Sequence, residues 1–169
     1  MSKITTRQLK SDDVNDFKAI RLSALKNSPE MFGSTYAVEA TRPLHVFAEV
    51  ISKYVVFAAY SQQQIIGMLI LDLKNHLTIQ PQAQLYGFFV EPAFRSQGIA
   101  TQLLQVAIQY GQHLVAQIML SVRANNTPAI HLYQKFGFQI AHRDMNIINK
   151  TQEDQDEIRM VYIYSPIAQ

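Results

Sequence analysis

The sequence predicts a single α/β domain, and three observations support this fold class. At 169 residues, the chain is long enough for one full-sized core and short for two. Hydrophobic residues make up 48% and charged residues 17%, which is typical of a globular protein with a packed core. Along the chain, apolar β-rich runs alternate with segments whose apolar residues recur at helical spacing. No repeat or linker interrupts this order, so one domain over 1–169 is expected.

The limits of the elements follow from start and stop signals. Ser11-Asp12-Asp13 is typical of a helix N-terminus, and Pro29 should end that helix because proline disfavours helical geometry in the residue before it. Pro43 suits the first turn of a second helix. The expected strands are 4–9, 54–60, 65–73, 84–90, 117–122, 138–148 and 158–164, and the expected helices begin at 11, 43, about 97 and 127. Segment 30–42 is an unusually apolar loop, and 149–157 an acidic exposed turn.

Composition excludes several classes of function. The chain has no cysteine, so thiolate catalysis and thiolate metal sites are excluded. Its histidines lack the close spacing of metal ligands, and the net charge of +2 is too small to indicate nucleic-acid binding. The arginines that such binding would need, Arg7, Arg95, Arg123 and Arg143, do not cluster. No apolar run is long enough to cross a bilayer and no signal core is present, so a cytoplasmic protein without membrane contact is expected.

The segment Val90–Thr101 joins an apolar strand to a helix through a basic turn of small residues. The first N–H groups of such a helix lack intrahelical partners and carry the positive end of its dipole. Gly98 would let an anion approach the backbone, Ala100 adds little bulk, and Arg95 places a guanidinium at the entrance. The segment matches neither common phosphate-loop motif, so a nucleotide triphosphatase is not expected. Taken alone, it could also be an ordinary strand-to-helix connection.

A second strand-turn-helix segment follows over 122–138. Asn126 or Thr127 can cap the helix, Pro128 suits its first turn, and Gly137 can terminate it in the left-handed conformation. Together, the two segments resemble the GCN5-related N-acetyltransferase (GNAT) family, whose motifs are Arg/Gln-x-x-Gly-x-Gly/Ala and Asn-x-x-Ala-x-x-Leu-Tyr followed by Gly-Phe. The matching residues are Arg95, Gly98, Ala100, Asn126, Ala129, Leu132, Tyr133, Gly137 and Phe138.

The resemblance implies the GNAT fold. This is a mixed, mostly antiparallel sheet of about seven strands, splayed between strands 4 and 5 and flanked by four helices. Acetyl-CoA would bind in the opening as the acetyl donor, with its pyrophosphate on the amides of Ser96, Gln97, Gly98, Ile99, Ala100 and Thr101. Its pantetheine arm would pair with the backbone of Phe88, Phe89 and Val90. Asn126 and Ala129 would contact it from the other side.

The implied reaction is acetyl transfer to a primary amine by direct attack in a ternary complex. Tyr133 matches the tyrosine that protonates the departing CoA thiolate, although an isolated Leu-Tyr pair would more often be core packing. A backbone N–H of Phe89 or Val90, where the family has a bulge, would stabilise the thioester oxyanion. The family's carboxylate positions hold Gln84 and Ser121 here, so the general base is Glu91 or a water chain.

The acceptor is left open by the sequence. Phe32, Gly33 and Tyr36 of the 30–42 loop and Tyr86 of the fourth strand could contact an amine-bearing substrate, or the loop aromatics could fill the core. Small-molecule amines and peptide or protein N-terminal amines are both compatible acceptors, and a homodimer is possible. The alternative function is a non-catalytic sensor that binds acyl-CoA, which the missing carboxylates favour and Tyr133 opposes.

Overall fold

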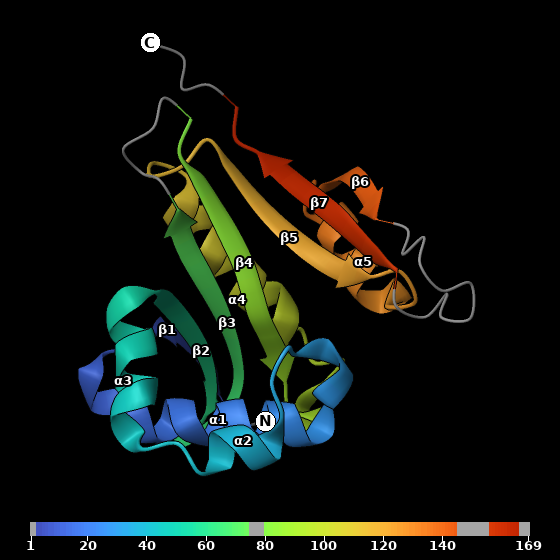
Figure 1. Ribbon diagram of the computed structural model, residues 1–169. Helices are drawn as coiled ribbons and strands as arrows, with labels where there is room; N and C mark the ends of the chain where they lie inside the picture. The colour runs from blue at the N-terminus through green and yellow to red at the C-terminus, as the bar shows by residue number, and fades with distance from the viewer. Residues whose placement is uncertain (1–2, 75–79, 145–155, 166–169) are drawn as a thin grey trace. The chain divides into compact units, whose positions relative to one another are not determined.

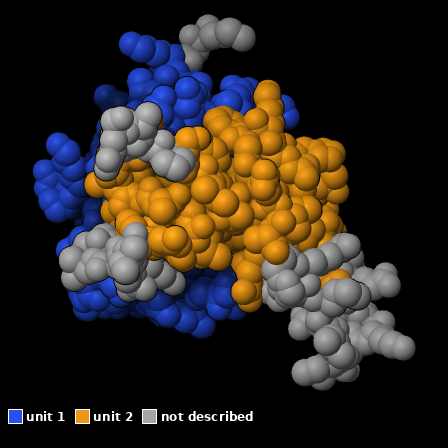
Figure 2. Space-filling model, turned by 90° about the horizontal axis from the view of Figure 1, so that it is seen from above, with its two compact units in different colours: residues 1–72, 87–109 blue, residues 73–86, 110–169 orange. Residues whose placement is uncertain are grey.

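The structure is a computed structural model that describes residues 3–74, 80–144 and 156–165. The chain divides into two compact units, coloured separately in Figure 2. Unit 1 comprises residues 1–72 and 87–109, and unit 2 comprises residues 73–86 and 110–169. Strand β4 (Gln82–Val90) contributes its first five residues to unit 2 and its last four to unit 1.

Unit 1 contains a three-stranded antiparallel arrangement (Figure 1). β2 (Val55–Ser61) pairs with β1 (Ile4–Gln8) on one side and with β3 (Gln64–Lys74) on the other. Every residue of β2 up to Tyr60 is buried. A central strand covered on both faces reads as a continuous apolar run, which explains why this strand does not alternate.

Two helices of unit 1 each bury one face in its core. In α1 (Val14–Asn27), the buried residues Phe17, Ile20 and Ala24 recur every three or four positions, and in α3 (Leu44–Lys53) Phe47 is buried. The Phe17 and Phe47 rings meet edge to face with centroids 6.3 Å apart. Burial of a side chain of this size contributes roughly 1.5–3 kcal/mol, so this contact stabilises the packing of the two helices against each other. The other helices are η1 (Ser11–Asp13), η2 (Pro29–Met31), α2 (Tyr36–Ala40), η3 (Pro92–Phe94) and α4 (Ile99–Gly111).

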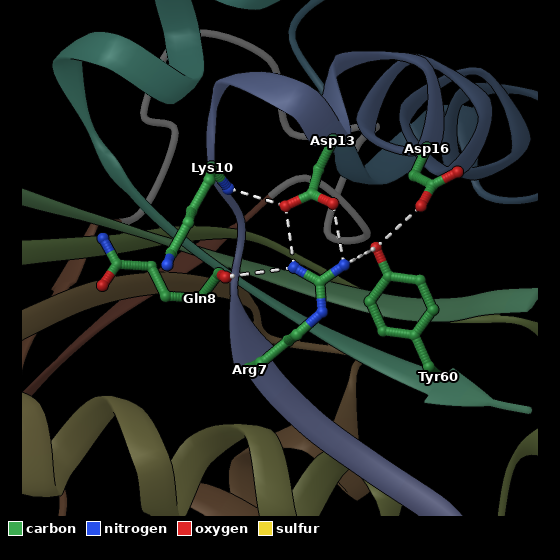
Figure 3. Close-up of polar contacts among 6 residues, drawn as sticks. All are labelled: Arg7, Gln8, Lys10, Asp13, Asp16 and Tyr60. Carbon is green, nitrogen blue, oxygen red and sulfur yellow. Dashed lines mark hydrogen bonds and ion pairs between the residues drawn. The ribbon is translucent and has the colours of Figure 1, made fainter. Parts of the chain in front are cut away.

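A polar network joins β1, β2 and the start of α1 in unit 1 (Figure 3). Arg7 donates from Nη1 and Nη2 to the two carboxylate oxygens of Asp13, both at 2.7 Å. Its Nη2 also contacts the Tyr60 hydroxyl at 3.2 Å, and that hydroxyl donates to Asp16 at 2.9 Å. The hydrogen bonds from Arg7 lower the pKa of Asp13 to about 2, so this carboxylate stays ionised at neutral pH.

Unit 2 is built on antiparallel strands. β7 (Glu157–Ile163) pairs with β5 (Gln117–Arg123) on one side and with β6 (Gln139–Asp144) on the other (Figure 1). In β5, Ile118, Leu120 and Val122 are buried and alternate with more exposed neighbours. The strand therefore packs one face on the core, where α5 (Thr127–Lys135) supplies a further buried side chain, Tyr133.

The seven described strands form one mixed sheet in the order β1-β2-β3-β4-β5-β7-β6. β4 and β5 are parallel, and their register pairs only Gln82–Gln84 with Gln117–Met119. The later residues of these two strands are not paired with each other. This confirms the predicted mixed sheet and its loss of pairing between strands 4 and 5.

The predicted order of elements is confirmed, with shifted limits. α4 begins at Ile99, two residues after the predicted start, and Pro43 is the N-cap of α3 instead of lying in its first turn. The described residues contain five α-helices and not the four that were predicted, because α2 lies in the segment predicted to be a loop. The predicted strand residues 145–148 and most of the acidic turn lie outside the described residues. In the part of the chain that the structure describes, every helix is too short or too polar to span a membrane.

Candidate functional site

The turn between β4 and α4, in unit 1, presents a row of backbone N–H groups. Gln102 is the first residue of the helix whose amide donates to a carbonyl, that of Gly98 at 3.0 Å. For the amides of 96–101, all of which lie within the described residues, no hydrogen-bond acceptor is recorded. A helix start with unfilled donors and the positive end of the helix dipole is suited to binding an anion.

The backbone of this turn gives access to those amides. Ser96 has φ +59° and Gly98 has φ +78°, so two residues of the turn adopt the left-handed conformation. Alternation of such residues with ordinary ones turns successive N–H groups toward one concave side, the geometry of anion-binding nests. A Cβ built on Gly98 would meet no atom within 4 Å, so the space above this residue is open to a ligand.

Arg95 fastens the turn to the end of β4. Its Nε donates to the Val90 carbonyl at 3.0 Å, and its guanidinium lies over the Phe89 ring at 5.8 Å from the centroid. Its side chain is exposed, and no contact of its two Nη groups is recorded in the described chain. Arg95 can therefore hold the strand end with one nitrogen while the other two face an anionic ligand.

The strand that precedes the turn is irregular at Gly87. This residue has φ +61°, and a Cβ there would lie 2.9 Å from Cδ1 of Ile70 on β3. A left-handed glycine inside a strand is typical of a bulge. The distortion was predicted at Phe89 or Val90; the left-handed residue lies two positions before Phe89.

In unit 2, Asn126 begins helix α5. Its side-chain oxygen accepts a hydrogen bond from the Ala129 amide at 3.3 Å, which makes it, and not Thr127, the N-cap residue. One atom of the predicted ligand-binding amide is thus used to start the helix. Asn126 and Ala129 are close together, as the motif spacing requires.

Tyr133 lies on the same helix and is 6% exposed. Burial raises the pKa of its phenol above the ordinary value, because the charged form would lose hydration. The hydroxyl therefore stays protonated throughout the physiological range. Its ring contacts Phe138, with centroids 5.6 Å apart.

The two strand positions predicted for a general base hold uncharged side chains. Gln84 on β4 pairs with Met119, and Ser121 on β5 pairs with Arg159 of β7. Neither side chain ionises near neutral pH, and the sequences of β4 and β5 contain no acidic residue. Glu91, partly buried at the strand exit, donates its backbone N–H to the Ile66 carbonyl at 2.9 Å. Among the described residues, no cluster of metal-ligating side chains occurs.

The 30–42 segment of unit 1 holds an ion pair that the sequence did not predict. Arg21 of α1 binds Glu39 of α2 through two hydrogen bonds, of 2.9 and 2.7 Å, and the Glu39 side chain is only 6% exposed. Burial alone would raise the pKa of Glu39, but Arg21 outweighs it and the pKa is lowered. The guanidinium of Arg21 also lies 4.8 Å from the centre of the Phe32 ring, which packs against the core. The pair fixes α2 to α1.

The predicted acceptor-binding aromatics differ in their environment. Phe32 is a packing residue of the unit 1 core, which favours the structural interpretation of this side chain. Tyr36, the first residue of α2, is 45% exposed, and Tyr86 on the unit 2 part of β4 is 38% exposed. Both tyrosines are therefore accessible to a substrate. Gly33 is exposed, with open space around its Cα.

Comparison with known proteins matches the sequence of this chain to a family. A model of the acetyltransferase (GNAT) family matches residues 23–138. The chain is 27% identical over 149 residues to the L-amino acid N-acetyltransferase AaaT of Escherichia coli, covering 83% of this chain and 85% of that protein.

Solved structures agree in fold. An acetyltransferase of the GNAT family from Streptococcus pneumoniae aligns with a TM-score of 0.79 at 17% identity, covering 96% of this chain and 100% of that one. Arabidopsis thaliana NAA60 in complex with acetyl-CoA aligns with a TM-score of 0.71 at 18% identity, covering 95% and 98%.

Proposed function

Because the chain belongs to the acetyltransferase (GNAT) family, we propose that it transfers the acetyl group of acetyl-CoA to a primary amine by direct attack in a ternary complex. The observation that carries this proposal is the turn 95–101. Its amides have no recorded acceptor, its backbone is open at Gly98, and Arg95 adds a cation. Backbone amides and a guanidinium are the hydrogen-bond donors that a pyrophosphate requires. This fit supports acetyl-CoA as the acetyl donor.

The end of β4 would hold the pantetheine arm. Phe88, Phe89 and Val90 end β4, and only Glu91 and the short helix η3 separate them from the turn, so a ligand bound at the turn can continue along this strand as an added extended segment. Arg95 holds the Val90 carbonyl in place, which keeps the strand end and the turn in a constant relation. A backbone N–H of Phe89 or Val90 would stabilise the oxyanion that forms when the amine attacks.

Tyr133 would act as general acid. When bound, acetyl-CoA supplies an activated acetyl group whose sulfur must leave as a thiolate and then gain a proton. A buried phenol with a raised pKa keeps its proton at neutral pH, so Tyr133 is present in its acid form when the thiolate departs.

Because β4 and β5 contain no acidic residue, fewer kinds of amine can serve as the acetyl acceptor. Without a carboxylate in these strands, Glu91 or water must remove the proton of the acceptor amine. The amine must therefore lose its proton readily. An α-amino group has a pKa of about 7.7–8.0, whereas a lysine side chain has about 10.4, so far more of the α-amine is neutral at pH 7.5. We therefore favour amino acids or peptide N-termini as acceptors, in line with the name of the E. coli relative.

The test is amine-dependent release of free thiol from acetyl-CoA. The acceptors are free L-amino acids, peptides with a free N-terminus, and Nα-blocked lysine as the matched control. Release with α-amines and not with blocked lysine supports the proposal, and intersecting initial-rate lines support the ternary complex. Tight binding of acetyl-CoA without release across this panel would instead support an acyl-CoA sensor, which the residues Gln84 and Ser121 favour.

A further inference from the structure

The C-terminus of α5 is closed by a motif that binds the backbone of Tyr133. The helix ends at Lys135, and Gly137 follows with φ +99°. The Phe138 amide donates to the Tyr133 carbonyl at 3.0 Å, and the Gly137 amide donates to the Gln134 carbonyl at 2.9 Å. This pair of hydrogen bonds defines a Schellman motif, which requires a left-handed residue where Gly137 stands.

The same motif brings two aromatic side chains together. A Schellman motif is commonly accompanied by an apolar contact between the residue after the glycine and the third residue from the helix end. Here those residues are Phe138 and Tyr133, whose ring centroids lie 5.6 Å apart with the planes tilted by 58°. Phe138 therefore holds Tyr133 by its backbone amide and by its ring. A tilted pair of this kind is worth about 0.5–1.5 kcal/mol beyond its buried area.

Tyr162 of β7 supports Phe138. The two ring centroids are 5.4 Å apart, and a Cβ on Gly137 would lie 3.5 Å from the Tyr162 ring, in ordinary contact. Phe138 is 2% exposed, so it has little room to change rotamer. The three rings belong to the same compact unit and form a series that runs from β7 to the side chain of Tyr133.

We propose that Phe138 is a positioning residue for acetyl transfer, which fixes the direction of the Tyr133 phenol so that its O–H meets the departing sulfur. This proposal rests on the proposed role of Tyr133 as general acid. Proton donation requires hydrogen-bond geometry, and a misplacement of about 1 Å can cost on the order of 100-fold in rate. Phe138 would set the geometry of the Tyr133 hydroxyl through its contact with the Tyr133 ring, and not through a contact with either substrate.

The experiment is a double-mutant cycle of Phe138→Leu and Tyr133→Phe, with kcat, the KM for acetyl-CoA and the melting temperature measured for each variant. Phe138→Leu should lower kcat about 10-fold or more, with a KM within about twofold of wild type. In the Tyr133→Phe background, which has no hydroxyl to position, Phe138→Leu should change kcat by less than about twofold.

The outcomes separate the two proposals. If Phe138→Leu lowers kcat by the same factor in both backgrounds, its role is merely structural and the positioning proposal is wrong. If Tyr133→Phe alone leaves kcat unchanged, the acid role fails, and the positioning role falls with it.

A second pair of variants tests the same series of rings if Phe138→Leu does not fold. Tyr162→Phe keeps the supporting ring and should keep kcat, whereas Tyr162→Leu removes the ring and should lower kcat several-fold in the Tyr133 background only. Equal kcat values for these two variants would also overturn the proposal.

Discussion

Replacement of Gly98 by alanine should weaken the binding of acetyl-CoA and leave the protein folded. The new Cβ would meet nothing within 4 Å, so no packing clash arises. The cost in the free protein comes from the backbone, because φ is +78° and an L-residue in that conformation loses about 1–2 kcal/mol. Domains are stable by about 5–15 kcal/mol, so the variant should remain folded.

The loss of affinity can be estimated from the donors of the turn. A methyl group on Gly98 would hold a phosphate oxygen away from the adjacent amides. Loss of one hydrogen bond to a charged group costs about 1.5–3 kcal/mol, which corresponds to roughly a 10- to 150-fold higher Kd. Gly98→Asn separates the loss of affinity from the backbone strain, because asparagine tolerates the left-handed conformation. It should be more stable than Gly98→Ala and should bind acetyl-CoA about as weakly.

Calorimetric titration with acetyl-CoA measures the effect, and Gly33→Ala is the matched control. Gly33 also has open space around its Cα, but it lies outside the turn, so its variant should bind as wild type does. S-acetyl-pantetheine lacks the pyrophosphate, and kcat/KM with this donor should change little in Gly98→Ala. A folded Gly98→Ala protein that binds acetyl-CoA with wild-type affinity would refute the assignment of the turn to the pyrophosphate.

Two further predictions concern stability. Gly87→Ala should destabilise the protein by about 3 kcal/mol in urea unfolding, because φ is +61° and the Cβ would lie 2.9 Å from Ile70. A loss below about 0.5 kcal/mol would contradict this. Arg7 lowers the pKa of Asp13 to about 2, so the contribution of this carboxylate is complete above about pH 4 and is lost as the pH falls toward 2. Asp13→Asn should lower the free energy of unfolding by about 1 kcal/mol at pH 7, because Arg7 is half exposed, and by less at pH 2. Equal losses at both pH values would contradict the pairing of Asp13 with Arg7.

The features that the sequence predicted best are local ones. The turn at Arg95–Thr101 and the start and end of α5 depend on residues a few positions apart, such as Asn126 with Ala129 and Phe138 with Tyr133. Caps, left-handed glycines and open amides follow from such short-range chemistry. The arrangement of the sheet came from family resemblance, because pairing between distant strands leaves no comparable local signal.

Other features depended on contacts that the sequence does not reveal. Glu39 is buried only because Arg21, 18 positions earlier, supplies two hydrogen bonds. The helix α2 that carries it had a weak signal in Thr35, whose side chain accepts from the Val38 amide at 3.4 Å as an N-cap. Gly87 within an apolar strand was a signal for the distortion of β4, since glycine in a strand often marks a bulge.

The kcat of Tyr133→Phe at saturating acetyl-CoA and amine shows whether Tyr133 is the acid in the proposed acetyl transfer. General acid catalysis contributes about 10²- to 10⁴-fold, so kcat should fall by at least about 100-fold while the affinity for acetyl-CoA stays within about threefold. A Tyr133→Phe protein that releases thiol at the wild-type rate in the presence of amine would contradict the proposed acid role of Tyr133.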